Sequence, residues 1–240
     1  MRIAGIVARG LSTPTDIEPQ PVKAVLFDFS GTLFHTIDDA EWIRAVAQEH
    51  GADLDDETVA RLVAELEAAW ALREVARAQH ARDLSTEVHR AAGLAWIRAV
   101  EGLAPLAEPM YDYLTSPRCW VPYDDTRPVL EELHRRGLPV AVVSDIAWDI
   151  RETFEYHRLR ELVDVFALSY EHGATKPDPR LFGYACEELG VDPRQVLVVG
   201  DTPGSDGGGA ALGMRAYILP ATGATARRRG LDAVLRLVED

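Results

Sequence analysis

The hydrophobic positions predict a layered α/β core. The run at residues 22–27 is too continuously apolar to alternate between a buried and an exposed face, so it predicts a strand buried on both faces, as in a parallel sheet. Later apolar runs predict four more strands, at residues 139–143, 165–169, 195–199 and 215–219. Strands that alternate with helices favour a parallel sheet with helices on both faces.

Helix signals separate the later strands. One helix starts at Asp125 and ends before Gly137, and a second covers residues 180–189 after an Asp178 cap. A closing helix is expected at residues 227–238. The order of elements therefore predicts the α/β class for this part of the chain.

A purely helical pattern fills residues 38–114. This stretch is rich in Ala, Glu, Arg and Leu, and its apolar residues at helical spacing predict four or five helices with no strand among them. Asp55 or Asp56 can cap one of these helices. The stretch is too long for a simple crossover between strands, so it predicts an inserted domain. The expected organisation is an N-terminal extension at 1–20, a core domain at 21–34 and 118–240, and a helical domain at 35–117.

Asp28 directly follows the first predicted strand. Ligands bind at the carboxyl ends of the strands in open α/β sheets, and Gly31 gives the backbone freedom to turn back beneath this carboxylate. Residues 28–33 read DFSGTL. This stretch resembles the first motif of the haloacid dehalogenase (HAD) superfamily, Asp-x-Asp-Gly-Thr-Leu.

Three later stretches resemble the other HAD motifs in the expected order. Ser144 follows a strand, as the Ser or Thr of motif two does. Lys176 lies in a Gly-x-x-Lys-Pro segment that is similar to motif three, and Asp201 with Asp206 resembles motif four. These motifs lie about one strand–helix repeat apart, so all of them can emerge at one edge of the sheet.

The resemblance implies a Mg²⁺-dependent phosphohydrolase that acts on a small phosphorylated metabolite through an aspartyl phosphate. Two carboxylates on one loop repel each other unless a cation lies between them, and hard oxygen ligands without His or Cys indicate Mg²⁺. By the HAD pattern, the catalytic residues are Asp28, Lys176 and Ser144, the substrate-binding residues are Thr32, Ser144, Asp145 and Lys176, and the metal ligands are Asp28, the Ser30 main-chain carbonyl, Asp201 and Asp206.

The inserted helical domain resembles the C1 cap of HAD relatives, which closes over the site and selects the substrate. Charged residues at helical spacing usually form a solvated face, and a Trp such as Trp42 or Trp70 is more often part of the core. The polar and aromatic candidates for substrate contact are Asp38, Asp39, Trp42, Arg73, Arg77, His80 and Arg82.

Ser30 departs from the HAD pattern. The usual Asp at this position protonates the leaving alcohol and later activates water, a contribution on the order of 10² to 10⁴ in rate. Serine cannot do this near neutral pH, so the sequence predicts a slow enzyme or one suited to good leaving groups. The candidates to replace the missing acid are His35, Asp38, Asp39, Asp145 and a water molecule.

Other HAD chemistries fit the residues less well. A 2-haloacid dehalogenase needs no acid at position 30, but it needs no metal either, and the Asp201–Asp206 pair argues against it. The only lysines are Lys23 and Lys176, so the cap lacks the lysine that a phosphonoacetaldehyde hydrolase uses to form an imine. A sugar phosphomutase depends on the Asp that Ser30 replaces. A non-catalytic binding module of the same fold stays open as an alternative.

Composition limits the partners and the cellular setting. The 240 residues, 47% of them hydrophobic, can bury a full core. A net charge of −14 argues against nucleic acid or an anionic membrane surface as a partner. No stretch has the length and apolar character of a membrane span, and residues 1–20 lack the features of a signal peptide. Cys119 and Cys186 lack metal spacing, which favours a reducing cytoplasm. The expected oligomeric state is a monomer or a homodimer.

Overall fold

The computed structural model describes residues 20–221 and 226–239. The predicted N-terminal extension therefore lies outside the described residues except for Gln20. None of the helices in the described ranges is long and apolar enough to cross a membrane.

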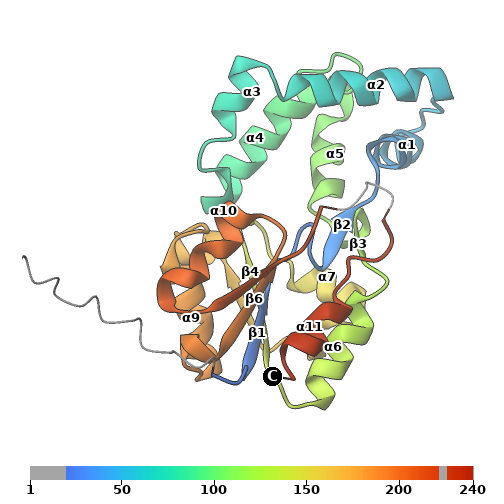
Figure 1. Cartoon of the computed structure of the whole chain (residues 1–240). Helices are drawn as coiled ribbons and strands as arrows, with labels where there is room; N and C mark the ends of the chain where they lie inside the picture. The colour runs from blue at the N-terminus through green and yellow to red at the C-terminus, as the bar shows by residue number, and fades with distance from the viewer. Residues whose placement is uncertain (1–19, 222–225, 240) are drawn as a thin grey trace, which may run out of the picture.

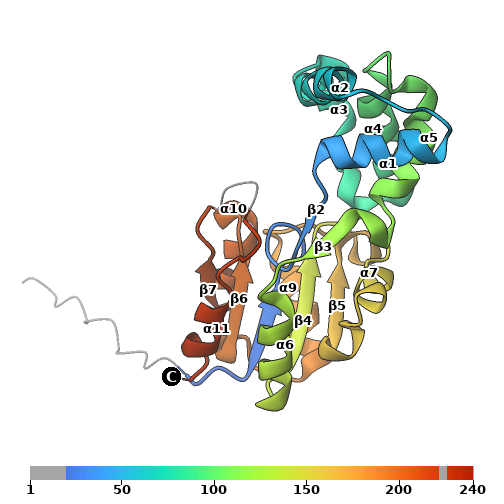
Figure 2. The ribbon, with the colours of Figure 1, turned by 90° about the vertical axis from the view of Figure 1, so that its right-hand side faces the viewer.

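A five-stranded parallel sheet forms the core, with strand order β5-β4-β1-β6-β7 (Figures 1 and 2). All five strands lie within two residues of their predicted positions, which confirms the α/β fold class. The strands are β1 (Ala24–Phe27), β4 (Val140–Ser144), β5 (Val165–Leu168), β6 (Val196–Gly200) and β7 (Arg215–Ile218).

Successive residues of the central strands point to opposite faces and build two separate hydrophobic clusters. On β1, Val25 and Phe27 join one cluster, which includes residues of α6 (Thr126–Arg135), α7 (Arg151–Tyr156) and α11 (Asp232–Leu237). Ala24 and Leu26 join the other cluster, with residues of α9 (Pro179–Leu189). Helices therefore cover both faces, which is why the strands are continuously apolar.

The closing helix is shorter than the sequence predicts, because α11 starts only at Asp232. The backbone N–H groups of Arg229, Gly230 and Leu231 donate to the Asp125 carboxylate, at 2.7–2.9 Å, and Gly230 has a φ of +90°. These contacts hold the segment before α11 in a non-helical turn. The Asp125 carboxylate consequently makes no capping hydrogen bond to α6, although the helix starts where predicted.

Five α-helices follow one another between residues 39 and 114 and stand beyond the sheet (Figure 1). Asp55 is the N-cap of the second helix, as predicted, and accepts a hydrogen bond from the Thr58 N–H. Trp42 is buried in the core as expected, whereas Trp70 is 42% exposed. The helices are α1 (Asp39–Glu49), α2 (Asp56–Ala69), α3 (Arg73–Ala78), α4 (Thr86–Arg98) and α5 (Ala107–Leu114).

A short antiparallel ribbon joins these helices to the sheet. Its strands are β2 (Phe34–Thr36) and β3 (Trp120–Pro122), which the sequence analysis missed because each has only three residues. Both ends of the helical insertion therefore leave the core side by side. The division of the chain into domains stays a prediction.

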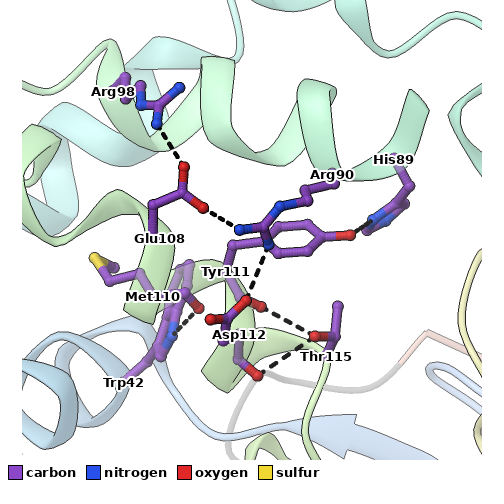
Figure 3. A network of polar contacts seen from close by, with 9 residues as sticks. All are labelled: Trp42, His89, Arg90, Arg98, Glu108, Met110, Tyr111, Asp112 and Thr115. Carbon is purple, nitrogen blue, oxygen red and sulfur yellow. Dashed lines mark hydrogen bonds and ion pairs between the residues drawn. The ribbon is translucent and has the colours of Figure 1, made fainter. Parts of the chain in front are cut away.

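Polar contacts bind α1, α4 and α5 together (Figure 3). Arg90 on α4 pairs with Glu108 and Asp112 on α5, and Glu108 also pairs with Arg98. The Trp42 indole N–H on α1 donates to a main-chain carbonyl of α5 at 3.2 Å. These bonds make the three helices a single packed unit.

Candidate active site

The register of the sheet brings the motif residues to one edge. Phe27 on β1 pairs with Val142 on β4 and with Val199 on β6. Parallel strands that are aligned in this way end together, so Asp28 and Asp201 leave adjacent strands at the same level. The residues that follow β1, β4 and β6 therefore lie at one edge of the sheet.

Lys176 lies between two carboxylates at this edge. It follows α8 (Ser169–His172), and its Nζ donates to Asp28 Oδ1 at 2.6 Å and to Asp206 Oδ1 at 2.7 Å. The lysine is 8% exposed and Asp206 is 1% exposed. Such a charge is retained in a protein interior only when partners compensate it, and here both partners are carboxylates.

Three carboxylates face a common point. Asp28, Asp201 and Asp206 each offer one oxygen, and these oxygens lie within 4.8 Å of one another. One ammonium against three carboxylates leaves an excess of negative charge. Hard oxygen donors at this spacing fit a divalent cation such as Mg²⁺.

Burial raises the pKa of Asp28 to about 6; Lys176 opposes this shift, and the nearby Asp206 carboxylate adds to it. Burial also disfavours the charged form of Lys176, but Asp28 and Asp206 outweigh this effect and raise the lysine pKa above its ordinary value. The ammonium therefore stays charged at neutral pH and offsets the negative charge of Asp28 and Asp206.

Two glycines let the carboxylates approach the backbone. Gly31 has a φ of +78°, and a Cβ there would lie 2.4 Å from Asp201 Oδ2. A Cβ on Gly200 would lie 2.1 Å from the Asp206 carboxyl carbon. A side chain at either position would displace one of the site carboxylates.

Asp145 has a positioning contact that the sequence analysis did not expect. Its Oδ1 accepts a hydrogen bond from the main-chain N–H of Lys176 at 2.8 Å. The carboxylate therefore anchors the lysine loop from the end of β4. Ser144 is buried beside it at the end of this strand, and Thr32 is fully buried, with no hydrogen-bond partner for its hydroxyl among the described residues.

Arg229 is a site residue that the sequence analysis missed. Its side chain is almost fully buried, and it donates to the main-chain oxygens of Gly31 and of Pro220. Asp125 holds the arginine backbone in turn. No local pattern in the sequence links residue 229 to the turn after Asp28, because the contact depends on the fold.

A large cavity adjoins the motif residues. It has a volume of about 1160 Å³ and reaches Gly31, Asp201 and Arg229 at the sheet edge. The first turn of α1 lines its other side with Asp38 and Asp39. Among the other predicted cap candidates, Arg73, Arg77 and His80 are exposed.

Comparisons with known proteins show the family of the chain. Residues 22–213 match the sequence profile of a family described as haloacid dehalogenase-like hydrolase. A phosphatase of Mycobacterium tuberculosis is 39% identical over 105 residues, which cover 43% of this chain and 48% of that protein. The phosphoglycolate phosphatase of Nitrosospira multiformis is 27% identical over 212 residues, which cover 84% and 85% of the two chains. The chain spans about half the length of several curated relatives that it matches.

A solved structure shares the overall fold. The crystal structure of a HAD phosphatase from Thermococcus onnurineus matches 90% of this chain and 98% of its own, with a TM-score of 0.60 and 23% sequence identity. At this identity the likeness concerns the fold alone.

Proposed function

Because the chain belongs to the haloacid dehalogenase-like hydrolases, we propose that it is a Mg²⁺-dependent phosphohydrolase that acts on a small phosphorylated metabolite. The observation that carries the proposal is the buried Lys176 ammonium. It contacts Asp28 and Asp206, which are two of the three clustered carboxylates. A charge arrangement of this kind suits a nucleophilic carboxylate that must meet a phosphate dianion. The phosphatases among the relatives support the same chemistry.

The proposed metal ligands are Asp28, Asp201, Asp206 and the Ser30 main-chain carbonyl. The first three fit the ion through their donor chemistry and their spacing. When bound, Mg²⁺ would neutralise phosphoryl oxygens and so reduce the repulsion that a carboxylate nucleophile meets.

The side chains of the site have separate roles in the proposed reaction. An Asp28 oxygen attacks phosphorus in line, and the bond from phosphorus to the alcohol oxygen breaks. Lys176 offsets the negative charge on the phosphoryl group, and the Ser144 hydroxyl donates a hydrogen bond to one of its oxygens. The fully buried Thr32 would position the turn after Asp28. Water then attacks the phosphorus of the aspartyl phosphate, which releases inorganic phosphate and restores Asp28.

The leaving alcohol must obtain a proton from a group other than Ser30. Three of the residues considered as proton donors already make other hydrogen bonds. Asp145 holds the Lys176 loop, Asp38 caps α1, and the His35 ring contacts a neighbouring carbonyl. Asp39 borders the large cavity, and burial raises the pKa of its carboxyl, with Glu67 and Asp38 adding to the shift. Water and Asp39 are therefore the proposed proton donors.

The α1–α5 insertion, at residues 35–117, is proposed to act as the cap domain over this site. The large cavity supports this role, because α1 lines one side of it and the sheet edge lines the other. A substrate in this cavity would touch both parts.

A dehalogenase is the second candidate, and Ser30 is the observation that favours it. Halide leaves without a proton, so an acid at this position is not needed. The clustered Asp201 and Asp206 carboxylates argue against it, because that reaction uses no metal.

Phosphate release tests the proposal. We expect the purified chain to release phosphate from some members of a panel of phosphate esters, acyl phosphates and nucleotides, with Mg²⁺ present. Release should vanish with EDTA and in Asp28→Asn, and should persist in Asp192→Asn, an exposed aspartate before β6 at the opposite edge of the sheet. Metal-independent release of halide from 2-haloacids, without release of phosphate, would replace the proposal with the dehalogenase.

A further inference from the structure

All five tryptophans of the chain line one cavity of about 200 Å³. Three belong to α1, α4 and β3, one directly follows α2, and the fifth follows β4 in the core. The five residues are Trp42, Trp70, Trp96, Trp120 and Trp148. Protein interiors are close-packed and leave few voids larger than a water molecule, so a cavity of this size among the largest side chains is a distinct feature.

The positions of three of these rings are fixed by hydrogen bonds. The indole N–H groups of Trp42, Trp96 and Trp120 donate to main-chain oxygens of Met110, Leu66 and Leu114, at 2.9–3.2 Å. Figure 3 shows the Trp42 bond. Because the N–H groups are satisfied, the rings are held in place, and the cavity is a stable part of the fold.

The rings are spaced to form continuous aromatic walls. Trp96 lies 5.8 Å from Trp42 and 4.6 Å from Trp70, measured between ring centroids, and Trp120 lies 6.0 Å from Trp148. The buried Trp148 N–H has no hydrogen-bond partner among the described residues. The cavity therefore offers ring surfaces to a bound group.

The tryptophan cavity adjoins the cavity at the motif residues. Thr36, Ile37 and Asp39, which join β2 to α1, line both. Trp148 lies on the same loop as Asp145, the residue that anchors Lys176. A group that occupies the tryptophan cavity is thus next to the space where the phosphohydrolase would hold its substrate.

We propose that the tryptophan cavity binds the leaving group of the substrate, and that the preferred substrates are phosphate monoesters of alcohols that carry an aromatic ring. This inference rests on the proposed phosphohydrolase function. An apolar cavity of about 150 Å³ is large enough for benzene, so about 200 Å³ holds a ring with a short substituent. Stacking on several indoles favours a flat ring over an alkyl chain of the same polarity.

Tryptophan fluorescence tests binding without turnover. All five fluorophores line the cavity, so ring binding must alter the emission of the chain. We expect benzyl phosphate, added to Asp28→Asn with Mg²⁺, to change the emission with a Kd about 10- to 100-fold below that of n-propyl phosphate. Equal Kd values for the two esters would overturn the proposal.

Kinetics with the same two esters test the cavity in the active chain. Both release a primary alcohol, so a rate difference reports on the ring. We expect kcat/KM to favour benzyl phosphate about 10- to 100-fold, and Trp70→Ala to remove most of this preference. Trp70 is 42% exposed, so its replacement leaves the core intact. Leu72→Ala is the matched control, because this residue is 40% exposed, is two positions away and lies outside the cavity lining.

The two proposals fail in different ways. Phosphate release with no preference for the benzyl ester would overturn the cavity proposal and leave the phosphohydrolase standing. An unchanged preference in Trp70→Ala and Trp148→Ala would overturn it as well. Ring-dependent fluorescence binding without phosphate release from any ester would refute the phosphohydrolase, while the cavity would remain a binding site for aromatic rings.

Discussion

Lys176 combines burial with two short ion pairs, to Asp28 and to Asp206. Taking these charges out of water is costly, and their mutual attraction only offsets that cost. The arrangement therefore gives the fold little net stability. In the proposed mechanism its benefit is chemical, because the ammonium would already be in place where negative charge accumulates during attack on a phosphoryl group.

Ser30 is the residue at which the sequence departs from the Asp-x-Asp-Gly-Thr-Leu motif that residues 28–33 resemble. Its side chain is exposed, so an aspartate fits at this position. We expect Ser30→Asp to raise kcat for alkyl phosphates by about 10²-fold, since it supplies the missing acid, and to change kcat for acyl phosphates less than about threefold. Steady-state rates for alkyl phosphates and for acyl phosphates measure this difference. Equal changes for both classes would show that leaving-group protonation does not limit the enzyme.

The loop after β6 contains glycines that let it pack closely against the sheet and against the Lys176 loop. Gly209 lies close to the sheet, because a Cβ there would be 2.9 Å from a Val198 methyl carbon. A Cβ on Gly208 would lie 2.5 Å from the main-chain oxygen of Pro177, directly after Lys176. Gly207 has open space around its Cβ position.

These glycines provide a matched pair of variants. We expect Gly208→Ala to push the Lys176 loop away, to lower activity at least about tenfold and to reduce the free energy of unfolding by about 1–3 kcal/mol. Gly207→Ala should change the free energy of unfolding by less than about 0.5 kcal/mol, since its φ of −66° suits alanine. Urea denaturation and phosphate release measure the two effects. Similar behaviour of the two variants would contradict this view of the loop.

His89 gives the α4–α5 unit a pH-sensitive stability. It is 5% exposed, and its Nδ1 lies 2.8 Å from the Tyr111 hydroxyl (Figure 3). Burial, together with the nearby Arg82 guanidinium, lowers the pKa of His89 to about 4. The neutral imidazole is therefore part of the folded state.

The folded protein resists protonation of His89, whereas the unfolded chain takes up the proton near pH 6.5. The stability from this group is complete above pH 6.5 and is lost as the pH falls to 4, about 3 kcal/mol in all. We expect the free energy of unfolding to fall more steeply in this window for the wild type than for His89→Gln, by up to about 1.4 kcal/mol per pH unit. Urea denaturation at several pH values measures both slopes, and parallel curves would rule out this role.

At the scale of the whole molecule, the sequence predicted the parts of the fold that depend on local signals. Continuous apolar runs identified the strands of the sheet, and the residues after β1, β4 and β6 predicted the edge at which the carboxylates gather. The β2–β3 ribbon was missed, because strands of three residues are too short to show an alternating pattern of hydrophobic and polar positions. The Arg229 contact to Gly31 was missed, because it joins segments that only the folded chain brings together.

The tryptophan cavity was equally hidden in the sequence. Its five rings come from four helical or ribbon segments and one core loop, and each alone resembles an ordinary core residue. The cavity depends on how the insertion meets the core, where the Thr86 hydroxyl donates to the Ala147 oxygen at 2.6 Å and the Ser169 hydroxyl donates to the Asp83 oxygen at 2.5 Å. Contacts between segments that are far apart in the sequence cannot be predicted from the spacing of residues within one segment.

The central claim is that Asp28 accepts a phosphoryl group with the help of Mg²⁺, and beryllofluoride tests it without knowledge of the substrate. This ion forms a stable mimic of a phosphoryl group on a carboxylate, and fluorine NMR detects the bound fluorides. We expect bound resonances when beryllium, fluoride and Mg²⁺ are present together, and their loss with EDTA or in Asp28→Asn. Bound resonances that persist in Asp28→Asn, or their absence from the wild type, would contradict the claim.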